Sequence, residues 1–158
     1  MPITFTKVSL PFGWLGNMAA FPIQYGGHRW RTSEALFQAL RFEDDLIREE
    51  IRKQTSPISA KMKAKQLDYR DRMVIEPMSH ADLENMRMCL RLKFNQHALL
   101  KRNLLNTGTE LIIEDIGRRN GLRHLFWGAK LVNGEWVGQN HMGQLLMAVR
   151  EEMKETTN

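Results

Sequence analysis

The sequence predicts one mostly helical domain with a few short strands, and three observations support this. The 158-residue length suits a single domain with a core of its own. Apolar residues recur at helical spacing in several segments, most clearly over residues 32–42 and 82–95. Two pairs of short apolar runs are joined by Gly26-Gly27 and by Asn133-Gly134, dipeptides that favour tight hairpin turns. We find no repeat, low-complexity tract or linker, so a single domain over residues 1–158 is expected.

The N-terminal segments lead into the first of these helices. Apolar and polar residues alternate over residues 3–8, which predicts a short strand. Residues 10–18 break every periodicity and combine Gly, Pro and Asn with two aromatic side chains. This segment is either a hydrophobic plug over the core or one wall of a pocket, with Asn17 as a polar contact. The hairpin around Gly26-Gly27 follows and ends where the helix begins.

The segment 32–42 predicts a buried helix with one polar stripe. Thr32 can cap it, and apolar side chains then cover most of its circumference. Glu34, Gln38 and Arg41 fall at positions i, i+4 and i+7, on one face. Buried polar groups need partners, so the stripe faces either a polar network or a ligand cleft. The residues alone favour a structural Glu34, an acid in the first turn that pairs with a nearby arginine.

The next segments continue the helical pattern. Residues 44–53 predict a helix whose inward side chains are Leu46, Ile47 and Ile51. Ser56-Pro57 is typical of a helix start, with the serine as cap and the proline at the first helical position. The helix that follows is rich in alanine and lysine. Residues 68–80 have a poor pattern and are expected to be mostly loop.

The C-terminal half predicts a comparable mixture of helices and short strands. The helix over residues 82–95 has Leu83, Met86, Leu90 and Phe94 on one face. The remaining expected segments, in order, are a helix at 98–105 that ends near Thr107-Gly108, a buried strand at 111–114, a basic loop at 115–125, a hairpin at 130–137 and a helix from His141 to about Met153.

The amino-acid composition indicates a class of binding partner and a cellular compartment. The net charge of +5 favours anionic partners such as nucleic acid or phosphorylated metabolites. One cysteine and 10 methionines suit a reducing cytoplasm, and Cys89 lies in an apolar helical pattern, as a small buried hydrophobe would. No apolar run approaches the ~18 to 20 residues that span a bilayer, and the N-terminus lacks the features of a signal peptide. We therefore expect a cytoplasmic protein without a membrane partner.

The sequence lacks the motifs of most known catalytic, cofactor-binding and metal-binding sites. The five histidines never pair at i and i+4 and there is one cysteine, so we expect no metal site. Phosphate-loop, dinucleotide-binding and G-x-S-x-G patterns are absent as well, and no cofactor is expected. What remains is carboxylate chemistry at Glu34. A carboxylate suits cleavage of an N-glycosidic bond, in which Trp127 could stack on a nucleobase and Arg123 or Lys63 could hold a phosphate.

Motifs along nearly the full chain resemble the NADAR superfamily of YbiA-like N-glycosidases. Each motif alone is weak evidence for the family, but the order and spacing of all of them together make the match specific. They are, in order, Gly16-Asn17 to Phe21-Pro22, Gly26-Gly27, Thr32-Ser33-Glu34 to Phe42, Ser56-Pro57 with Ala60-Lys61, Leu90 to Phe94, Leu104 to Gly108, Phe126-Trp127-Gly128, and Gly138-Gln139-Asn140 to Arg150.

The resemblance implies an α+β, predominantly helical, YbiA-like single domain with short β-hairpins. It implies hydrolysis of an N-glycosidic bond, either in phosphorylated ribosyl intermediates of the riboflavin pathway or in ADP-ribose attached to guanine in nucleic acid. Glu34 matches the family's catalytic glutamate. The resemblance therefore favours a catalytic role for Glu34 over the structural role that the residues alone favour. The predicted site has Glu34 as catalytic residue, Asn17, Gln38, Lys63, Arg123, Trp127, Gly128 and Asn140 as substrate-binding residues, and no metal.

Two departures from the family pattern bear on the substrate. An acid often follows the Trp-Gly pair in YbiA-like enzymes, and this chain has Ala129 there; Glu114 or Asp115 could substitute if the fold brings either close. A family tryptophan before the Leu90 to Phe94 motif aligns with Met78 or its neighbours. The competing hypothesis is a non-catalytic module that binds ADP-ribose or nucleic acid in the same cleft.

Overall fold

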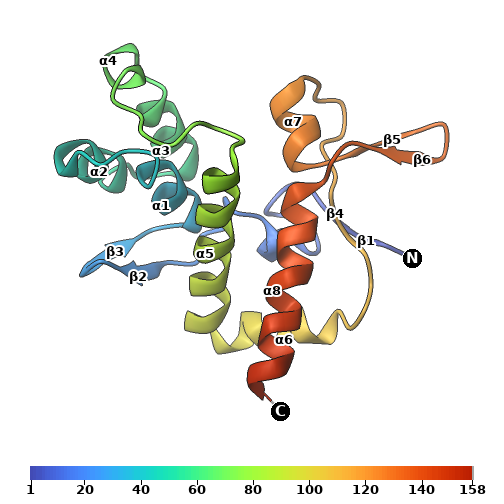
Figure 1. Cartoon of the computed structure of the whole chain (residues 1–158). Coiled ribbons are helices and arrows are strands. Elements are labelled where there is room, and N and C mark those ends of the chain that lie inside the picture. The colour runs from blue at the N-terminus through green and yellow to red at the C-terminus, as the bar shows by residue number, and fades with distance from the viewer. Residues whose placement is uncertain (158) are drawn as a thin grey trace. The chain divides into compact units, whose positions relative to one another are not determined.

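The computed structural model describes residues 1–157, and these form mostly helices with three two-stranded sheets (Figure 1). The prediction of a mostly helical α+β fold is confirmed. Backbone contacts divide the chain into two compact units. The first unit combines Met1–Gly16 with the chain from His97 onward, and the second unit is Asn17–Gln96. No helix within residues 1–157 is long and apolar enough to cross a membrane.

The second unit is built around one short buried helix, α1. Its elements are β2 (Ile23–Tyr25), β3 (His28–Trp30), α1 (Ser33–Ala39), α2 (Asp45–Arg52), α3 (Pro57–Ala64), α4 (Leu67–Arg70) and α5 (His80–Gln96). The helix α1 packs against α2, α3 and α5, so it has neighbours on most of its surface. The predicted hairpin is confirmed: β2 and β3 are antiparallel, and Gly26 and Gly27 take the positive φ angles of the turn.

Local chemistry explains where the helices of this unit begin. The Thr32 hydroxyl accepts a hydrogen bond from the Ala35 backbone N–H at 3.1 Å and caps α1, as predicted. Asp44 caps α2, and Ser56 caps α3 through a reciprocal pair of bonds with Ser59. These polar caps satisfy backbone donors that a helix start would leave unpaired.

Three expectations for this unit need correction. Leu46 is 79% exposed, because the buried face of α2 repeats at Ile47 and Ile51 and Leu46 lies about 100° away from it. The helix α5 begins at His80, two residues before the expected start. Its first turn buries Asp82 completely, whereas Leu83, expected to face inward, is only half-buried.

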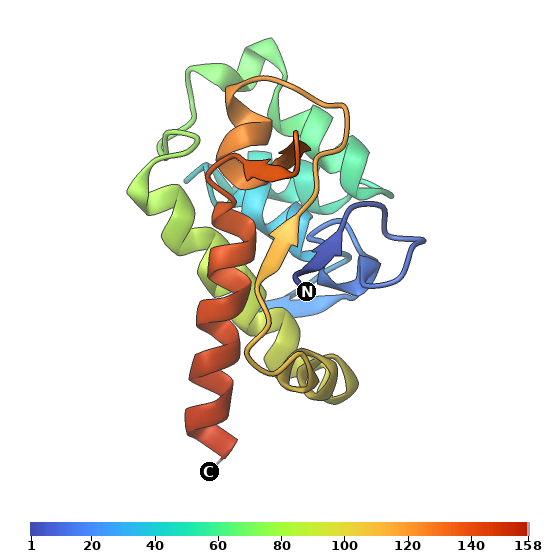
Figure 2. The ribbon, with the colours of Figure 1, turned by 90° about the vertical axis from the view of Figure 1, so that its right-hand side faces the viewer.

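The first unit joins the two ends of the chain. Its elements are β1 (Ile3–Phe5), the 3-10 helix η1 (Gly13–Leu15), α6 (Ala98–Asn106), β4 (Ile112–Glu114), α7 (Leu122–Trp127), β5 (Lys130–Val132), β6 (Glu135–Val137) and α8 (His141–Thr157). The strands β1 and β4 are parallel, with Ile3 opposite Ile112, and they lie side by side in Figure 1 and Figure 2. The hairpin of β5 and β6 turns at Asn133-Gly134, as predicted.

Three boundaries of the first unit also differ from expectation. The strand β1 ends at Phe5, because a turn follows in which the Leu10 N–H donates to the Lys7 carbonyl. The expected basic loop at 115–125 contains the start of α7. Leu122, Leu125 and Phe126 do fall at helical spacing, but α7 has only six residues, too few for a periodic pattern to stand out. The helix α8 continues past Met153 to Thr157.

A lysine on α5 is buried beside two aromatic rings. Lys93 is 0% exposed, and its ammonium nitrogen lies 5.5 Å from the centre of the Phe21 ring and 5.3 Å from that of Phe94. Burial disfavours the charged form and lowers the pKa of Lys93 from 10.5 to about 7.

This pKa predicts how stability changes with pH. Between about pH 7 and pH 10 the unfolded chain binds a proton at Lys93 that the folded chain lacks, so the free energy of unfolding should rise with pH. Below pH 7 both states bind this proton, so the free energy of unfolding no longer changes with pH through Lys93. The expected slope is on the order of 1 kcal/mol per pH unit. Urea unfolding at several pH values should show this rise in the native sequence and its loss in Lys93→Met. The exposed Lys53→Met is the control, and parallel curves for the native chain and Lys93→Met would contradict the prediction.

Candidate active site

Asn17 holds the first turn of α1 and the carboxylate of Glu34. Its backbone carbonyl accepts hydrogen bonds from the Glu34 N–H and the Ser33 hydroxyl, both at 3.2 Å. Its side-chain amide donates to Glu34 Oε2 at 2.6 Å, and its Oδ1 is bonded to Ser33 Oγ. The loop before the hairpin therefore provides a polar contact at Asn17, directed at the predicted catalytic residue.

The polar stripe of α1 is buried and continuous. Glu34 is 7% exposed, and its Oε1 accepts a hydrogen bond from Gln38 Nε2 at 2.8 Å. Gln38 Oε1 in turn accepts a bond from Arg41 Nη1 at 3.2 Å. Arg41 closes the series with a two-pronged ion pair to Asp82, at 2.9 Å from Nε and 2.8 Å from Nη2. Of the two alternatives expected for this stripe, a polar network or a ligand cleft, the structure contains the polar network.

The order of donors in this series fixes the orientation of the Gln38 amide. A guanidinium can only donate, so Arg41 must face the oxygen of Gln38. The amide nitrogen then faces Glu34. Both carboxylate oxygens of Glu34 thus receive an amide N–H, one from Gln38 and one from Asn17. A structural Glu34 was expected to pair with an arginine. In the structure, the side-chain partners of its carboxylate are two neutral amides instead.

Asp82 is the member of this series that the sequence analysis missed. In the sequence it marks only the expected start of the helix over residues 82–95, yet it is fully buried. Its Oδ2 also accepts a bond from the Met78 N–H at 2.9 Å, and its own N–H donates to Ser79 Oγ. The sequence offered one signal: Arg41, on a buried stripe, required an acidic partner.

The lone cysteine is an inert neighbour of these carboxylates. Cys89 is fully buried on α5. Burial raises the pKa of its thiol well above the usual value, and the charges of Glu34 and Asp82 raise it further. The thiol stays protonated, which agrees with the prediction of a small buried hydrophobe rather than a nucleophile.

The predicted Trp-Gly pair lies in the first unit, at the end of α7. Trp127 is half-buried, and its ring meets that of Phe126 edge-on at 5.0 Å between ring centres. The Phe126 ring also lies 4.2 Å from the His141 ring. Gly128 ends the helix where only glycine fits, because a Cβ there would lie 2.5 Å from the Glu114 carbonyl oxygen.

The structure brings Glu114 close to this pair. The same Cβ position on Gly128 would be 3.3 Å from Glu114 Oε2, and the Ala129 N–H donates to the Glu114 carbonyl at 2.9 Å. Asp115 also bridges to Ala129 through the backbone, but its Oδ1 accepts a bond from the Gly117 N–H within its own turn. Of the two candidates to replace the missing acid, Glu114 has its carboxylate at the Trp-Gly pair.

Asn140 uses both of its side-chain polar atoms on β4. Oδ1 accepts from the Glu114 N–H at 3.0 Å, and Nδ2 donates to the Ile112 carbonyl at 2.9 Å. Its backbone N–H donates to Gly128, and its φ of 53° lies in the left-handed region that asparagine tolerates. Gly143 allows this close approach, because a Cβ there would overlap the Ile112 carbonyl. Asn140 therefore positions β4 and the Trp-Gly pair against the start of α8.

The two predicted phosphate-binding cations lie in different units. Lys63, on α3, is half-buried with its ammonium nitrogen 5.8 Å from the centre of the Tyr69 ring. Arg123, on α7, is exposed, and its Nη2 lies 3.5 Å from His124 Nε2. Of the predicted site residues, the second unit brings Asn17, Glu34 and Gln38 into direct contact. Trp127, Gly128 and Asn140 form a connected group in the first unit.

The sequence matches the model of the NADAR domain over residues 4–154, nearly the whole chain. The chain belongs to the NADAR family. Its relatives include an N-glycosidase YbiA from Shigella boydii, 36% identical over 96% of this chain and 88% of that protein. A Vibrio vulnificus relative named as a riboflavin biosynthesis protein is 30% identical over 98% of this chain, which spans 39% of that longer protein.

A solved structure supports the same relationship. The NMR structure of the Escherichia coli protein YbiA has a TM-score of 0.78 and 32% sequence identity, and the match covers 99% of this chain and 89% of that one. The NADAR protein described here is thus an enzyme of the N-glycosidase class, a hydrolase of N-glycosyl bonds. Within residues 1–157, no group of three or more His, Cys, Asp or Glu side chains could hold a metal ion.

The buried ion pair of this NADAR protein predicts a large and asymmetric effect on stability. Asp82→Ala leaves the Arg41 guanidinium buried without its partner, so the free energy of unfolding should fall by about 3 kcal/mol. Replacing both residues, with Arg41→Met and Asp82→Leu, should cost less than the single change because no charge stays behind. Urea unfolding measures all variants. The exposed Glu84→Ala on the same helix is the control, and an equal effect of Asp82→Ala and Glu84→Ala would contradict the prediction.

Proposed function

We propose that this protein hydrolyses the N-glycosidic bond of a ribosylated, phosphorylated substrate and that Glu34 is its catalytic carboxylate. The observation that carries the proposal is the held carboxylate of Glu34. Both of its oxygens accept an amide N–H, and a buried ion pair fixes one of those amides. Each carboxylate oxygen has a second acceptor site, so Glu34 can also bind a water molecule.

The reaction follows from the chemistry of a ribosyl cation. The bond between the ribosyl C1 and the base nitrogen breaks, and its electron pair leaves with the nitrogen, which takes up a proton. The ribosyl group develops positive charge, which the Glu34 carboxylate stabilises. A water molecule oriented by Glu34 adds its oxygen to C1 and gives up a proton, first to the carboxylate and then to solvent. No covalent enzyme intermediate and no metal is needed.

Gln38, Arg41 and Asp82 act as positioning residues in this proposal. The ion pair orients the Gln38 amide, and the amide presents a donor to Glu34. Held in this way, the carboxylate needs little rearrangement as charge develops on the ribose.

The remaining predicted site residues, which come from both units, keep their predicted roles in this proposal. Trp127 is the proposed stacking surface for the leaving base, and Glu114 is the proposed replacement for the acid absent at Ala129. Arg123 and Lys63 are the proposed phosphate-binding cations, in agreement with the net charge of +5. Asn140 is proposed to support the site indirectly, because β4 occupies both of its polar atoms.

The relatives favour an enzyme over the non-catalytic binding module. Several are named N-glycosidases, including the one from Shigella boydii. The Vibrio vulnificus relative supports riboflavin-pathway ribosylamino-pyrimidine intermediates as one candidate substrate. ADP-ribosylated guanine in nucleic acid is the other candidate.

The role of Glu34 predicts a large loss of rate in Glu34→Gln. The amide has no negative charge to stabilise a ribosyl cation and is a poor base, so turnover should fall about 10²- to 10⁴-fold. The amount of product released per enzyme molecule, followed by mass spectrometry, measures the effect. Glu84→Gln, which removes an exposed carboxylate on α5, should keep the native rate.

Folding must be checked in the same variant. Glutamine can accept only one of the two amide N–H bonds that Glu34 accepts, so Glu34→Gln should lose about 1 to 2 kcal/mol of stability and still fold. A folded Glu34→Gln enzyme that turns over at the native rate would remove Glu34 from the mechanism.

Two substrates tested side by side decide the finer assignment. The protein is incubated with ADP-ribosylated guanine DNA and, separately, with the phosphorylated ribosylamino-pyrimidine intermediates of riboflavin synthesis. Release of a ribose product from either one, lost in Glu34→Gln, supports the proposal and identifies the substrate class. Glu114→Gln should lower that release if its carboxylate replaces the missing acid, whereas Asp115→Asn should not. Absence of release from both would contradict the proposed reaction.

A further inference from the structure

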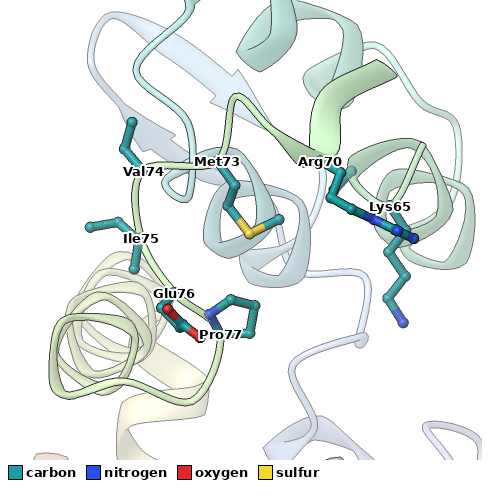
Figure 3. A pocket seen from close by; sticks show the side chains of 8 residues that line it. Lys65, Arg70, Met73, Val74, Ile75, Glu76 and Pro77 are labelled. Carbon is teal, nitrogen blue, oxygen red and sulfur yellow. The ribbon is translucent and has the colours of Figure 1, made fainter. Parts of the chain in front are cut away.

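The second unit also contains an open pocket of about 540 Å³, which the loop between α4 and α5 borders (Figure 3). The volume falls in the range that holds a small organic ligand. The pocket is lined by Ala64, Lys65, Arg70, Met73, Val74, Ile75, Glu76 and Pro77.

The wall of this pocket is held by backbone hydrogen bonds. The N–H groups of Val74 and Ile75 both donate to the Arg41 carbonyl, at 2.8 Å and 3.2 Å. Met73 forms an antiparallel bridge with Phe42, and the Met78 N–H donates to the Asp82 carboxylate. The loop is thus fixed at several points, to the residues that follow α1 and to α5, and the pocket is formed before any ligand arrives.

The charges in the pocket are separated. Lys65 and Arg70 lie together on one side, and Glu76 lies with Pro77 on the other (Figure 3). The Met73 side chain extends into the space between the two groups. Within residues 1–157, the structure gives neither the Arg70 guanidinium nor the Glu76 carboxylate an ion pair or a hydrogen-bond partner, and both residues are exposed.

This arrangement restricts the ligand. Two cations at one end suit a phosphate. The apolar surface of Met73 and Pro77 would stay uncovered if an inorganic anion bound alone. A fatty-acid-like ligand would place its apolar end against the Glu76 carboxylate, at a cost in desolvation. A ligand with a phosphate at one end and, toward the other end, a flat ring that carries hydrogen-bond donors satisfies all three surfaces.

We propose that this pocket binds a nucleoside monophosphate. Its phosphate contacts Lys65 and Arg70, its base lies on Met73 and Pro77, and Glu76 accepts hydrogen bonds from an amino or hydroxyl group at the far end. The proposal uses no residue of the Glu34 series as a ligand contact and does not depend on the proposed reaction. Binding and hydrolysis can therefore fail separately.

The test is calorimetric titration of the full chain with AMP, with adenosine and inorganic phosphate as comparison ligands. We expect AMP to bind at least tenfold more tightly than either fragment. Lys65→Gln combined with Arg70→Gln should weaken AMP binding on the order of tenfold. Met73→Glu, which places a carboxylate between the cations and the apolar wall, should weaken it at least as much.

The matched control removes the same charges elsewhere in the same unit. Lys53→Gln combined with Arg29→Gln changes two exposed cations outside the pocket and should bind AMP as the native chain does. Equal weakening in the control and pocket variants would show that net charge alone attracts AMP and would overturn the proposal. Absence of AMP binding, phosphate binding as tight as AMP, or AMP binding unchanged by both pocket variants would overturn it as well. Melting temperatures confirm that each variant is folded.

Discussion

The second unit depends on the buried ion pair between Arg41 and Asp82. It joins the end of α1 to the first turn of α5, and it orients the Gln38 amide that holds Glu34. The Asp82 carboxylate also holds the Met78 N–H, and the Arg41 carbonyl holds the loop that follows α4. Since a charge without its partner is costly in a buried setting, neither residue can move without the other. The Glu34 carboxylate and the pocket wall share this anchor.

The candidate site was predictable where its residues share one helix. Glu34, Gln38 and Arg41 fall on one face because of helical spacing alone, and their burial required polar partners. The partners themselves were not predictable in the same way. Asp82 lies 41 residues beyond Arg41, and its position at a helix start has an ordinary structural explanation. The family resemblance, rather than the pattern, favoured a catalytic role for Glu34.

Elements with strong local chemistry were found correctly. The caps at Thr32 and Ser56 and the turns at Gly26-Gly27 and Asn133-Gly134 are determined by neighbouring atoms, so a short window of sequence identifies them. The helix α7 was missed because its six residues are too few to show a clear helical period. Leu46 was misplaced because apolar character does not by itself fix the side of a helix, which depends on packing against distant segments.

The discontinuous first unit has a consequence for the order of assembly during synthesis. The strand β1 leaves the ribosome well before its partner β4, which begins only at Ile112. The second unit is one continuous stretch, Asn17–Gln96, whose contacts close shorter loops. We expect this unit to form first on the growing chain. Until β4 appears, β1 is an unpaired strand edge, and its short length of three residues limits its ability to join another chain.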